Sequence, residues 1–104
     1  MSIPSQVALC DVGPRDGFQF EDRFIPTDLK VDTITALANA GVPRIQVTSF
    51  VHPKWVPQMR DAEAVCERLP ARDDVTYAGL ALNPKGLERA VAAGVSHVDL
   101  SIAT

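Results

Sequence analysis

The sequence is poor in the residues that mark secreted, membrane or metal-cluster proteins, with 2 cysteines, 2 histidines and 1 tryptophan among 104 residues. Two cysteines make no disulfide framework, and their apolar and helical contexts predict that Cys10 and Cys66 are reduced core residues. No apolar run approaches the roughly 20 residues that span a bilayer. The N-terminal segment lacks the basic and apolar regions of a signal peptide. We therefore expect a cytoplasmic chain with no membrane partner.

A strong excess of one charge is also missing. The chain has 10 basic and 13 acidic residues, and the basic ones are scattered along it. This excludes the electrostatic footprint of a nucleic-acid-binding protein. With 46% hydrophobic and 22% charged residues, the composition is that of an ordinary globular protein. Residues 1–104 are long enough for one small domain.

The most informative stretch is DVGPRDGFQ at residues 11–19. We interpret it as a loop in which Gly13 and Gly17 allow unusual backbone angles and turn Arg15 and Asp16 toward one small volume. An arginine there can stabilise charge that develops on a substrate oxygen, and an aspartate can bind Mg²⁺ or Mn²⁺. A surface turn with a local ion pair is the alternative, and the short motif alone leaves both open.

Apolar periodicity and turn residues predict strands alternating with helices along the rest of the chain. Thr27 and Asn83 are expected to cap helices, and Gly41 and Gly94 to end them. Val31, Ile34, Leu37 and Ala38 are predicted as the apolar stripe of the first helix, and Leu87, Ala90 and Val91 as that of the last. The expected strands are 7–10, 44–50, 74–82 and 97–103, and the expected helices are 27–40, 61–69 and 84–93.

The remaining segments, 11–25 and 51–59, are predicted to be loops. The second is unusually apolar, which suggests packing over a site or a partner. Trp55 and Met59 are expected to pack within it. Asp99 lies in a predicted strand and faces either side depending on the register, so it receives no role.

Segments 38–47 and 91–100 repeat the same order of helix end, glycine, short link and strand. Strand–helix alternation of this kind implies parallel strands joined by right-handed crossovers. We predict an α/β fold of about four parallel strands alternating with helices, which is the N-terminal half of a (β/α)8 TIM barrel. An open flavodoxin-like sheet is the competing architecture, and periodicity does not separate the two.

With these segments in place, the chain resembles the N-terminal part of the 3-hydroxy-3-methylglutaryl-CoA lyase family. The resemblance is carried by DVGPRDGFQ at 11–19, TSFVHPKWVPQM at 48–59 and, more weakly, LNPKGLERAVAAGV at 82–95. It implies that residues 1–104 are a partial TIM-barrel domain of the pyruvate carboxyltransferase-like type. It also implies a divalent-metal-dependent carbon–carbon lyase that cleaves a CoA thioester to acetyl-CoA and a keto acid.

Position by position, the resemblance implies that Arg15 is the catalytic arginine and that Asp16 is the one metal-binding carboxylate in this half of the barrel. The metal would be Mg²⁺ or Mn²⁺. Gln46 stands where the family carries a glutamate, and it is either a tuned substrate-site residue or an ordinary inward-facing one. The other residues implied to line the mouth of the substrate site are Gln19, Ser49 and Phe50.

Three functions remain open. The first is the lyase, with this chain as its N-terminal portion. The second is a related Claisen-type condensing enzyme or carboxyltransferase, which Gln46 favours slightly, and the third is a catalytically incomplete half-barrel. One aspartate cannot hold Mg²⁺ well, and open sheet edges favour association. The expected small-molecule partner is an acyl-CoA substrate. We expect the chain alone to be inactive, and either to form a homo-oligomer or to need a missing C-terminal half.

Overall fold

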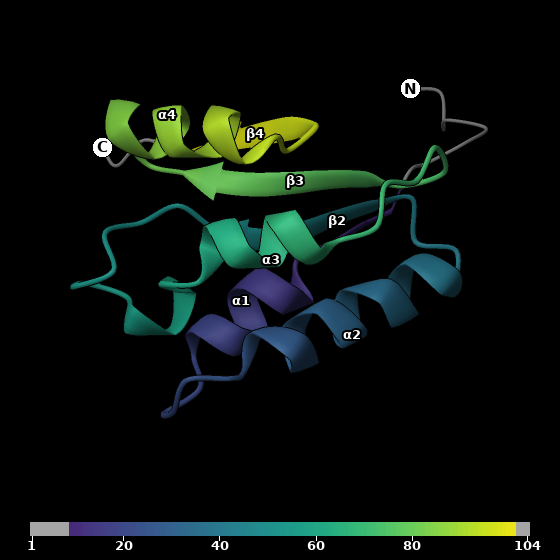
Figure 1. Ribbon diagram of the computed structural model, residues 1–104, viewed down its shortest axis with the longest axis horizontal. Coiled ribbons are helices and arrows are strands. Elements are labelled where there is room, and N and C mark those ends of the chain that lie inside the picture. The colour runs from purple at the N-terminus through teal and green to yellow at the C-terminus, as the bar shows by residue number, and fades with distance from the viewer. Residues whose placement is uncertain (1–8, 102–104) are drawn as a thin grey trace, which may run out of the picture.

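The computed structural model describes residues 9–101 and shows strands and helices in alternation (Figure 1). Short helical segments, α1 (Gly13–Gln19) and the 3-10 helix η1 (Pro57–Met59), lie in the two regions that were expected to be loops. The elements are β1 (Cys10–Asp11), α1 (Gly13–Gln19), α2 (Thr27–Asn39), β2 (Arg44–Ser49), η1 (Pro57–Met59), α3 (Ala62–Arg68), β3 (Thr76–Ala81), α4 (Pro84–Ala93) and β4 (His97–Leu100).

The strands form one parallel sheet in the order β1-β2-β3-β4. Each strand thus lies beside the next one in the sequence, with a helix between them. That order matches the first half of a (β/α)8 TIM barrel, whereas a flavodoxin-like sheet changes direction after its first strands. The half-barrel prediction is confirmed. The first residues expected in β1, and residues 102–103 of the expected last strand, lie outside the described part of the chain.

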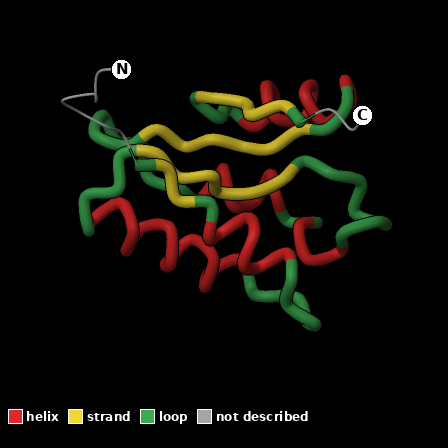
Figure 2. Tube along the Cα trace, turned by 180° about the vertical axis from the view of Figure 1, so that it is seen from behind, coloured by secondary structure: helices red, strands yellow, loops and turns green. Residues whose placement is uncertain are grey.

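The longer helices pack on one face of the sheet, with α2 and α3 along β2 and α4 along β3 (Figure 2). Side chains of a strand alternate between faces, so Ile45 and Val47 enter the core on the helix side while Arg44 and Gln46 point to the opposite, inner face. The main core cluster consists of Ile34, Ala38, Ile45, Val47, Val65 and Val75. Among residues 9–101, no helix is both long and apolar enough to cross a bilayer.

The predicted ends of helices are mostly confirmed. Gly41 and Gly94 have φ of 96° and 79°, the left-handed conformation that suits glycine after a helix. The Asn83 side chain accepts a hydrogen bond from the Gly86 amide at 2.8 Å, so it caps α4 as expected. The prediction for Thr27 is wrong, because Thr27 lies inside the first turn of α2 and its hydroxyl donates to Asp61 instead.

The prediction that residues 11–19 form a loop is also wrong, since α1 occupies most of that stretch. Gly13 and Gly17 are helical and do not have positive φ. Pro14 in the first turn and Asp16 near the positive end of the helix dipole are favourable for a helix start. The Asp11 carboxylate also accepts the Gly13 amide hydrogen at 2.7 Å. A short helix, not glycine freedom, orients the motif.

Burial differs from expectation at two other positions. Cys10 is exposed, because it lies on the edge strand β1 and no described residue covers it, whereas Cys66 is partly buried. Both thiols are free, and burial raises the pKa of Cys66 to about 11. Met59 is buried as predicted, but Trp55 is 81% exposed in the loop before η1. The expectation that Trp55 packs within its loop is therefore wrong.

Helix α4 packs on the sheet through a different face from the one predicted, since of the predicted apolar stripe only Ala90 is buried. Leu87 and Val91 are exposed, while Gly86 and Ala90 are buried. The cause is the close approach of the backbone, since a Cβ on Gly86 would lie 2.6 Å from the carbonyl oxygen of Phe50. Only small residues fit where the helix crosses so near the end of β2.

A buried ion pair ties α2 to the start of α3. Lys30 is 2% exposed, and its ammonium donates to Asp61 at 2.6 Å and to the Gln58 carbonyl at 2.5 Å. It also lies 4.6 Å from the ring centroid of Phe24. Asp61 accepts from Thr27 at 2.7 Å through its other oxygen. The Lys30 ammonium and both carboxylate oxygens of Asp61 thus each have a hydrogen-bond partner among the described residues.

Candidate functional site

The candidate site is a set of polar side chains that meet on the inner face of the sheet. In parallel strands, paired residues point to the same face. Gln46 pairs with Ala78, and Leu80, two positions further along β3, pairs with Asp99. Gln46 and Asp99 therefore share the inner face, on strands that flank β3. The short, fully buried Ala78 lies between them and lets the two longer side chains meet.

These side chains form a continuous series of hydrogen bonds. Arg15 Nε donates to Gln46 Oε1 at 2.6 Å, and Gln46 Nε2 donates to Asp99 Oδ2 at 2.8 Å. Arg44 donates to the other Asp99 oxygen at 2.5 Å, and Arg15 also contacts Asp16 Oδ1 at 3.3 Å. We call these five residues the polar network. It contains two guanidinium groups, two carboxylates and one neutral amide, so its charges balance.

Burial differs across the polar network. Gln46 is 5% exposed and sits at its centre, whereas half of the Asp16 side chain is exposed to solvent. Arg15 and Asp16 follow the carboxyl end of β1, which is the edge where barrel enzymes place their active sites. The network thus runs from a buried amide to a carboxylate that is open to a ligand.

Other predicted site residues lie near the network without joining it. A register shift between Gln46 and Thr48 brings Ser49 opposite Leu80, so Ser49 also faces inward despite its odd spacing from Gln46. Ser49 Oγ and Gln19 Oε1 are buried and have no hydrogen-bond partner among the described residues. Buried polar atoms are normally satisfied, so such atoms point to a missing ligand or solvent partner.

Phe50 lies elsewhere. Its ring packs toward the helices, against Gly79 of β3 and in a second core cluster with Ala62 and Ala90. The structure therefore brings together Arg15, Asp16 and Gln46, but it places the Phe50 side chain away from them.

Asp99 and Arg44 were not identified from the sequence. A carboxylate in the middle of a parallel strand is a signal in itself, because a charged group there needs a partner. Without the strand register, however, the sequence does not say whether Asp99 faces the polar network or the helices.

A divalent cation would find one carboxylate in the network that is not already held by two other side chains, that of Asp16. Asp16 is accessible and acidic, so it suits Mg²⁺ or Mn²⁺ as a single ligand. Residues 9–101 contain no group of three or more histidine, cysteine, aspartate or glutamate side chains close enough to hold a metal. Mg²⁺ wants six oxygen ligands, so the described residues do not fit a complete metal site and further ligands would have to come from outside them.

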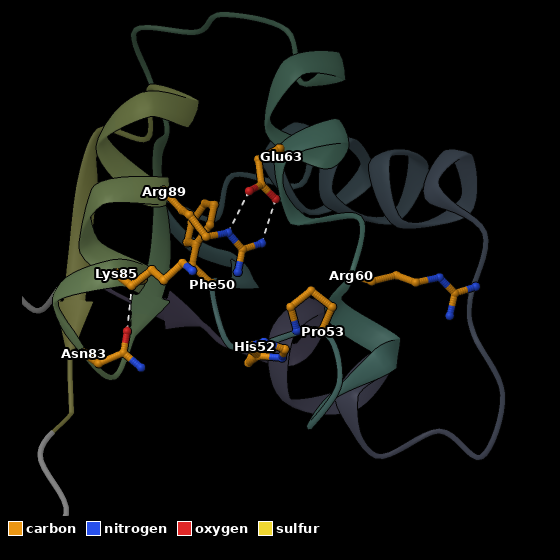
Figure 3. Close-up of a pocket in the computed structure, with 9 residues that line it drawn as sticks. Phe50, His52, Pro53, Arg60, Glu63, Asn83, Lys85 and Arg89 are labelled. Atoms are coloured by element: carbon orange, nitrogen blue, oxygen red, sulfur yellow. Dashed lines mark hydrogen bonds and ion pairs between the residues drawn. The ribbon is translucent and has the colours of Figure 1, made fainter.

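A cavity of about 420 Å³ lies elsewhere, between α3 and α4 (Figure 3). In it, Arg89 binds the Glu63 carboxylate with two hydrogen bonds of 2.8 Å, which lowers the pKa of Glu63. Arg60 points away from this pair (Figure 3) and stacks on Phe24, with 3.7 Å between its guanidinium carbon and the ring centroid. Phe50 is the one predicted site residue in its lining, so this cavity is separate from the polar network.

A parallel sheet in sequential order, with an arginine and an aspartate in the short helix that follows its first strand, is the arrangement of the N-terminal half of a (β/α)8 barrel protein. The sequence profile described as HMGL-like matches residues 6–104, and the chain belongs to this family. It is 46% identical over 99 residues to the mitochondrial hydroxymethylglutaryl-CoA lyase of Mus musculus, covering 95% of this chain and 30% of the mouse protein. The resemblance seen in the sequence is thereby confirmed.

Solved structures agree with this assignment. Hydroxymethylglutaryl-CoA lyase from Pseudomonas aeruginosa superposes with a TM-score of 0.88 at 45% identity, covering 96% of this chain and 33% of that one. An HMG-CoA lyase from Acinetobacter baumannii, solved with coenzyme A and 3-methylmalate, gives a TM-score of 0.86 at 42% identity, covering 89% of this chain and 30% of that one. The chain spans about a third of the length of these relatives.

Proposed function

We propose that this chain forms the first half of the barrel of a divalent-metal-dependent carbon–carbon lyase of the HMG-CoA lyase type. The substrate is an acyl-CoA such as 3-hydroxy-3-methylglutaryl-CoA, which is cleaved to acetyl-CoA and a keto acid. One observation carries the proposal. Arg15 and Asp16 lie in α1, the short helix that follows β1, and Arg15 donates to Gln46 at 2.6 Å, in a chain that is 46% identical to such a lyase.

The described residues support definite roles in that reaction. The tertiary hydroxyl gives its proton to a base and becomes the ketone of the keto acid, while the electron pair of the breaking carbon–carbon bond moves onto the thioester, whose oxygen becomes an enolate oxygen. The enolate carbon then takes up a proton to give acetyl-CoA. The Arg15 guanidinium polarises the carbonyl and stabilises this negative charge. Ser49 and Gln19, which the family resemblance places at the mouth of the substrate site, would bind polar groups of the substrate. A divalent cation held by Asp16 and by ligands from outside the described residues would supply further positive charge to the reacting oxygens.

A second candidate is a Claisen-type condensing enzyme or carboxyltransferase on the same scaffold. It rests on Gln46, a neutral amide in the place of the family's glutamate. Both candidates share the CoA thioester, and the Acinetobacter baumannii relative bound to coenzyme A supports that choice of substrate class. Because the chain spans about a third of its relatives, we propose that it is inactive alone. Self-association and a cytoplasmic location stay predictions.

The test is acetyl-CoA release from 3-hydroxy-3-methylglutaryl-CoA with Mg²⁺, using the protein in the form that its source cell makes. Arg15→Lys keeps the charge but loses the guanidinium fork, so kcat should fall at least about 100-fold, as for the loss of one oxyanion donor. Arg72→Lys alters a surface arginine remote from the network and should leave turnover within about twofold. Turnover that survives Arg15→Lys would contradict the proposal. Condensation of an acyl-CoA without cleavage would favour the second candidate.

A further inference from the structure

The direction of the Gln46 amide is dictated by its two partners. A guanidinium only donates hydrogen bonds, and an ionised carboxylate only accepts them. The amide must therefore turn its oxygen to Arg15 and its NH₂ group to Asp99, which is the arrangement with distances of 2.6 Å and 2.8 Å. If the amide were reversed, both contacts would become repulsive. Whether residue 99 accepts or donates a hydrogen bond thus decides which end of the Gln46 amide faces Arg15.

Asp99 itself is firmly held. One oxygen accepts from Arg44 at 2.5 Å and the other from Gln46 at 2.8 Å, so two neighbouring inward side chains of β2 fix one carboxylate on β4. All three residues sit on strands and not on loops, and strands hold side chains more precisely. The constraint on Arg15 therefore originates in the sheet.

We propose that Asp99 is a positioning residue for Arg15, and that it acts through Gln46. In this arrangement the amide at 46 and the carboxylate at 99 are a matched pair. A glutamate at 46 would set two carboxylates about 3 Å apart, which is unfavourable for a partly buried pair of like charges. The neutral Gln46 is thus the residue that suits a chain with Asp99, and the carboxylate that Gln46 contacts lies on β4. The catalytic consequence of the proposal rests on the proposed function, whereas the positioning of Arg15 does not.

The variant Asp99→Asn separates this role from a merely structural one. Arg44 is a donor and takes the asparagine oxygen, which leaves the asparagine NH₂ group facing Gln46. The Gln46 amide must then reverse, and its own NH₂ group meets Arg15. Asp99→Asn should therefore break a hydrogen bond of Arg15, a residue that Asp99 does not touch. If Asp99 served only to pair Arg44, the Arg15 contact would survive.

The measurement is hydrogen exchange of the Arg15 Nε–H, followed by ¹⁵N NMR at mildly acidic pH. Asp99→Asn should speed this exchange at least about tenfold, because the hydrogen bond from Arg15 Nε to Gln46 is lost. Asp74→Asn is the matched control, since Asp74 also pairs with an arginine, Arg72, but on the remote surface. It should leave the exchange of Arg15 within about twofold of the unaltered protein.

A double variant provides the decisive test. In Gln46→Glu/Asp99→Asn, the carboxylate at 46 accepts from Arg15 and from the asparagine NH₂ group, while Arg44 keeps the asparagine oxygen. The network is complete again, so slow exchange of Arg15 should return. Gln46→Glu alone should lower Tm, and the double variant should recover it. Unchanged exchange in Asp99→Asn, or a double variant no better than the single ones, would overturn the proposal.

Kinetics then tell the two proposals apart. In the active protein, Asp99→Asn should lower kcat about tenfold and change KM less than about twofold, since Arg15 acts on the reacting oxygen. If the exchange result holds but no acyl-CoA is cleaved, Asp99 positions Arg15 and the proposed function fails. If cleavage is observed while Asp99→Asn leaves the exchange of Arg15 unchanged, the proposed function stands and the positioning role fails.

Discussion

The buried ion pair between Lys30 and Asp61 gives a strong prediction about stability. Replacing Asp61 with alanine removes the carboxylate that accepts the Lys30 ammonium at 2.6 Å. The ammonium, 2% exposed, keeps the Gln58 carbonyl as its one acceptor within the described chain. Breaking a buried pair from one side costs about 3–5 kcal/mol, because it leaves a buried charge without its partner. Asp61→Ala should therefore destabilise the protein by about that amount.

The Asp28–Arg68 pair supplies a matched control, because it joins the same two helices on the surface. The side chain of Asp28 is 84% exposed and that of Arg68 is 54% exposed. Exposed pairs of this kind contribute roughly 0–1 kcal/mol, so Asp28→Ala should have little effect. The two alanine variants thus differ in the burial of the charge that is left behind.

Thermal and urea unfolding measure the difference. For a domain of this size, 1 kcal/mol shifts Tm by roughly 4–8 °C, so Asp61→Ala should lower Tm by at least about 12 °C. If that variant does not fold, Lys30→Met/Asp61→Leu decides the question, since an apolar pair leaves no buried charge and should recover most of the stability. An Asp61→Ala variant as stable as Asp28→Ala would refute the reasoning. So would an apolar pair that is less stable than Asp61→Ala.

Two further predictions follow from packing and from charge. Gly79→Ala would place a Cβ 2.5 Å from the buried ring of Phe50 and should cost about 1–3 kcal/mol of stability. Gly17→Ala, in α1, would place a Cβ with no atom within 4 Å and should stabilise the protein by about 0.4–1 kcal/mol. Thermal unfolding of the two variants measures the difference. Arg89 lowers the folded-state pKa of Glu63 below its ordinary 4.5, so the pair contributes stability above about pH 4.5 that is lost as the pH falls through the lowered pKa. Glu63→Gln should therefore lose less stability between neutral and acidic pH in urea titrations, and an unchanged pH dependence would contradict this.

Much of the fold was predictable because its signals are local. Asn83 and Pro84 start a helix, Gly41 and Gly94 end helices, and the repeated order of these signals gave the parallel alternation of strands. The motif of residues 11–19 was also found from the sequence, but its conformation was not. Glycine permits a turn without requiring one, and the proline and aspartate beside it favour the start of a helix.

What could not be predicted depends on contacts between distant segments. Asp99 meets Gln46 only through the register of three strands, and one shift in β2 turns Ser49 inward. Lys30 lies at helical spacing from Ile34 and Ala38, on the buried stripe of α2, so its burial could have been read from periodicity. Its partner Asp61, 31 residues away, could not. The pattern of apolar residues predicts where a helix or strand lies, whereas the partner of a polar side chain is known only from the tertiary structure.

The sequential order of the strands has a consequence for how the protein folds during synthesis. Each described strand pairs only with strands adjacent to it in the sequence, so none of these described pairings has to wait for a distant part of the chain. As the ribosome releases the chain, each new strand can dock on the edge left by the previous one. Each pairing nevertheless closes a crossover, such as the one that joins Cys10 to its partner Arg44, so each docking step is slower than the formation of a hairpin. The same order means that an unpaired edge moves along the nascent chain until the next strand covers it, and that edge is where a chaperone would be most useful.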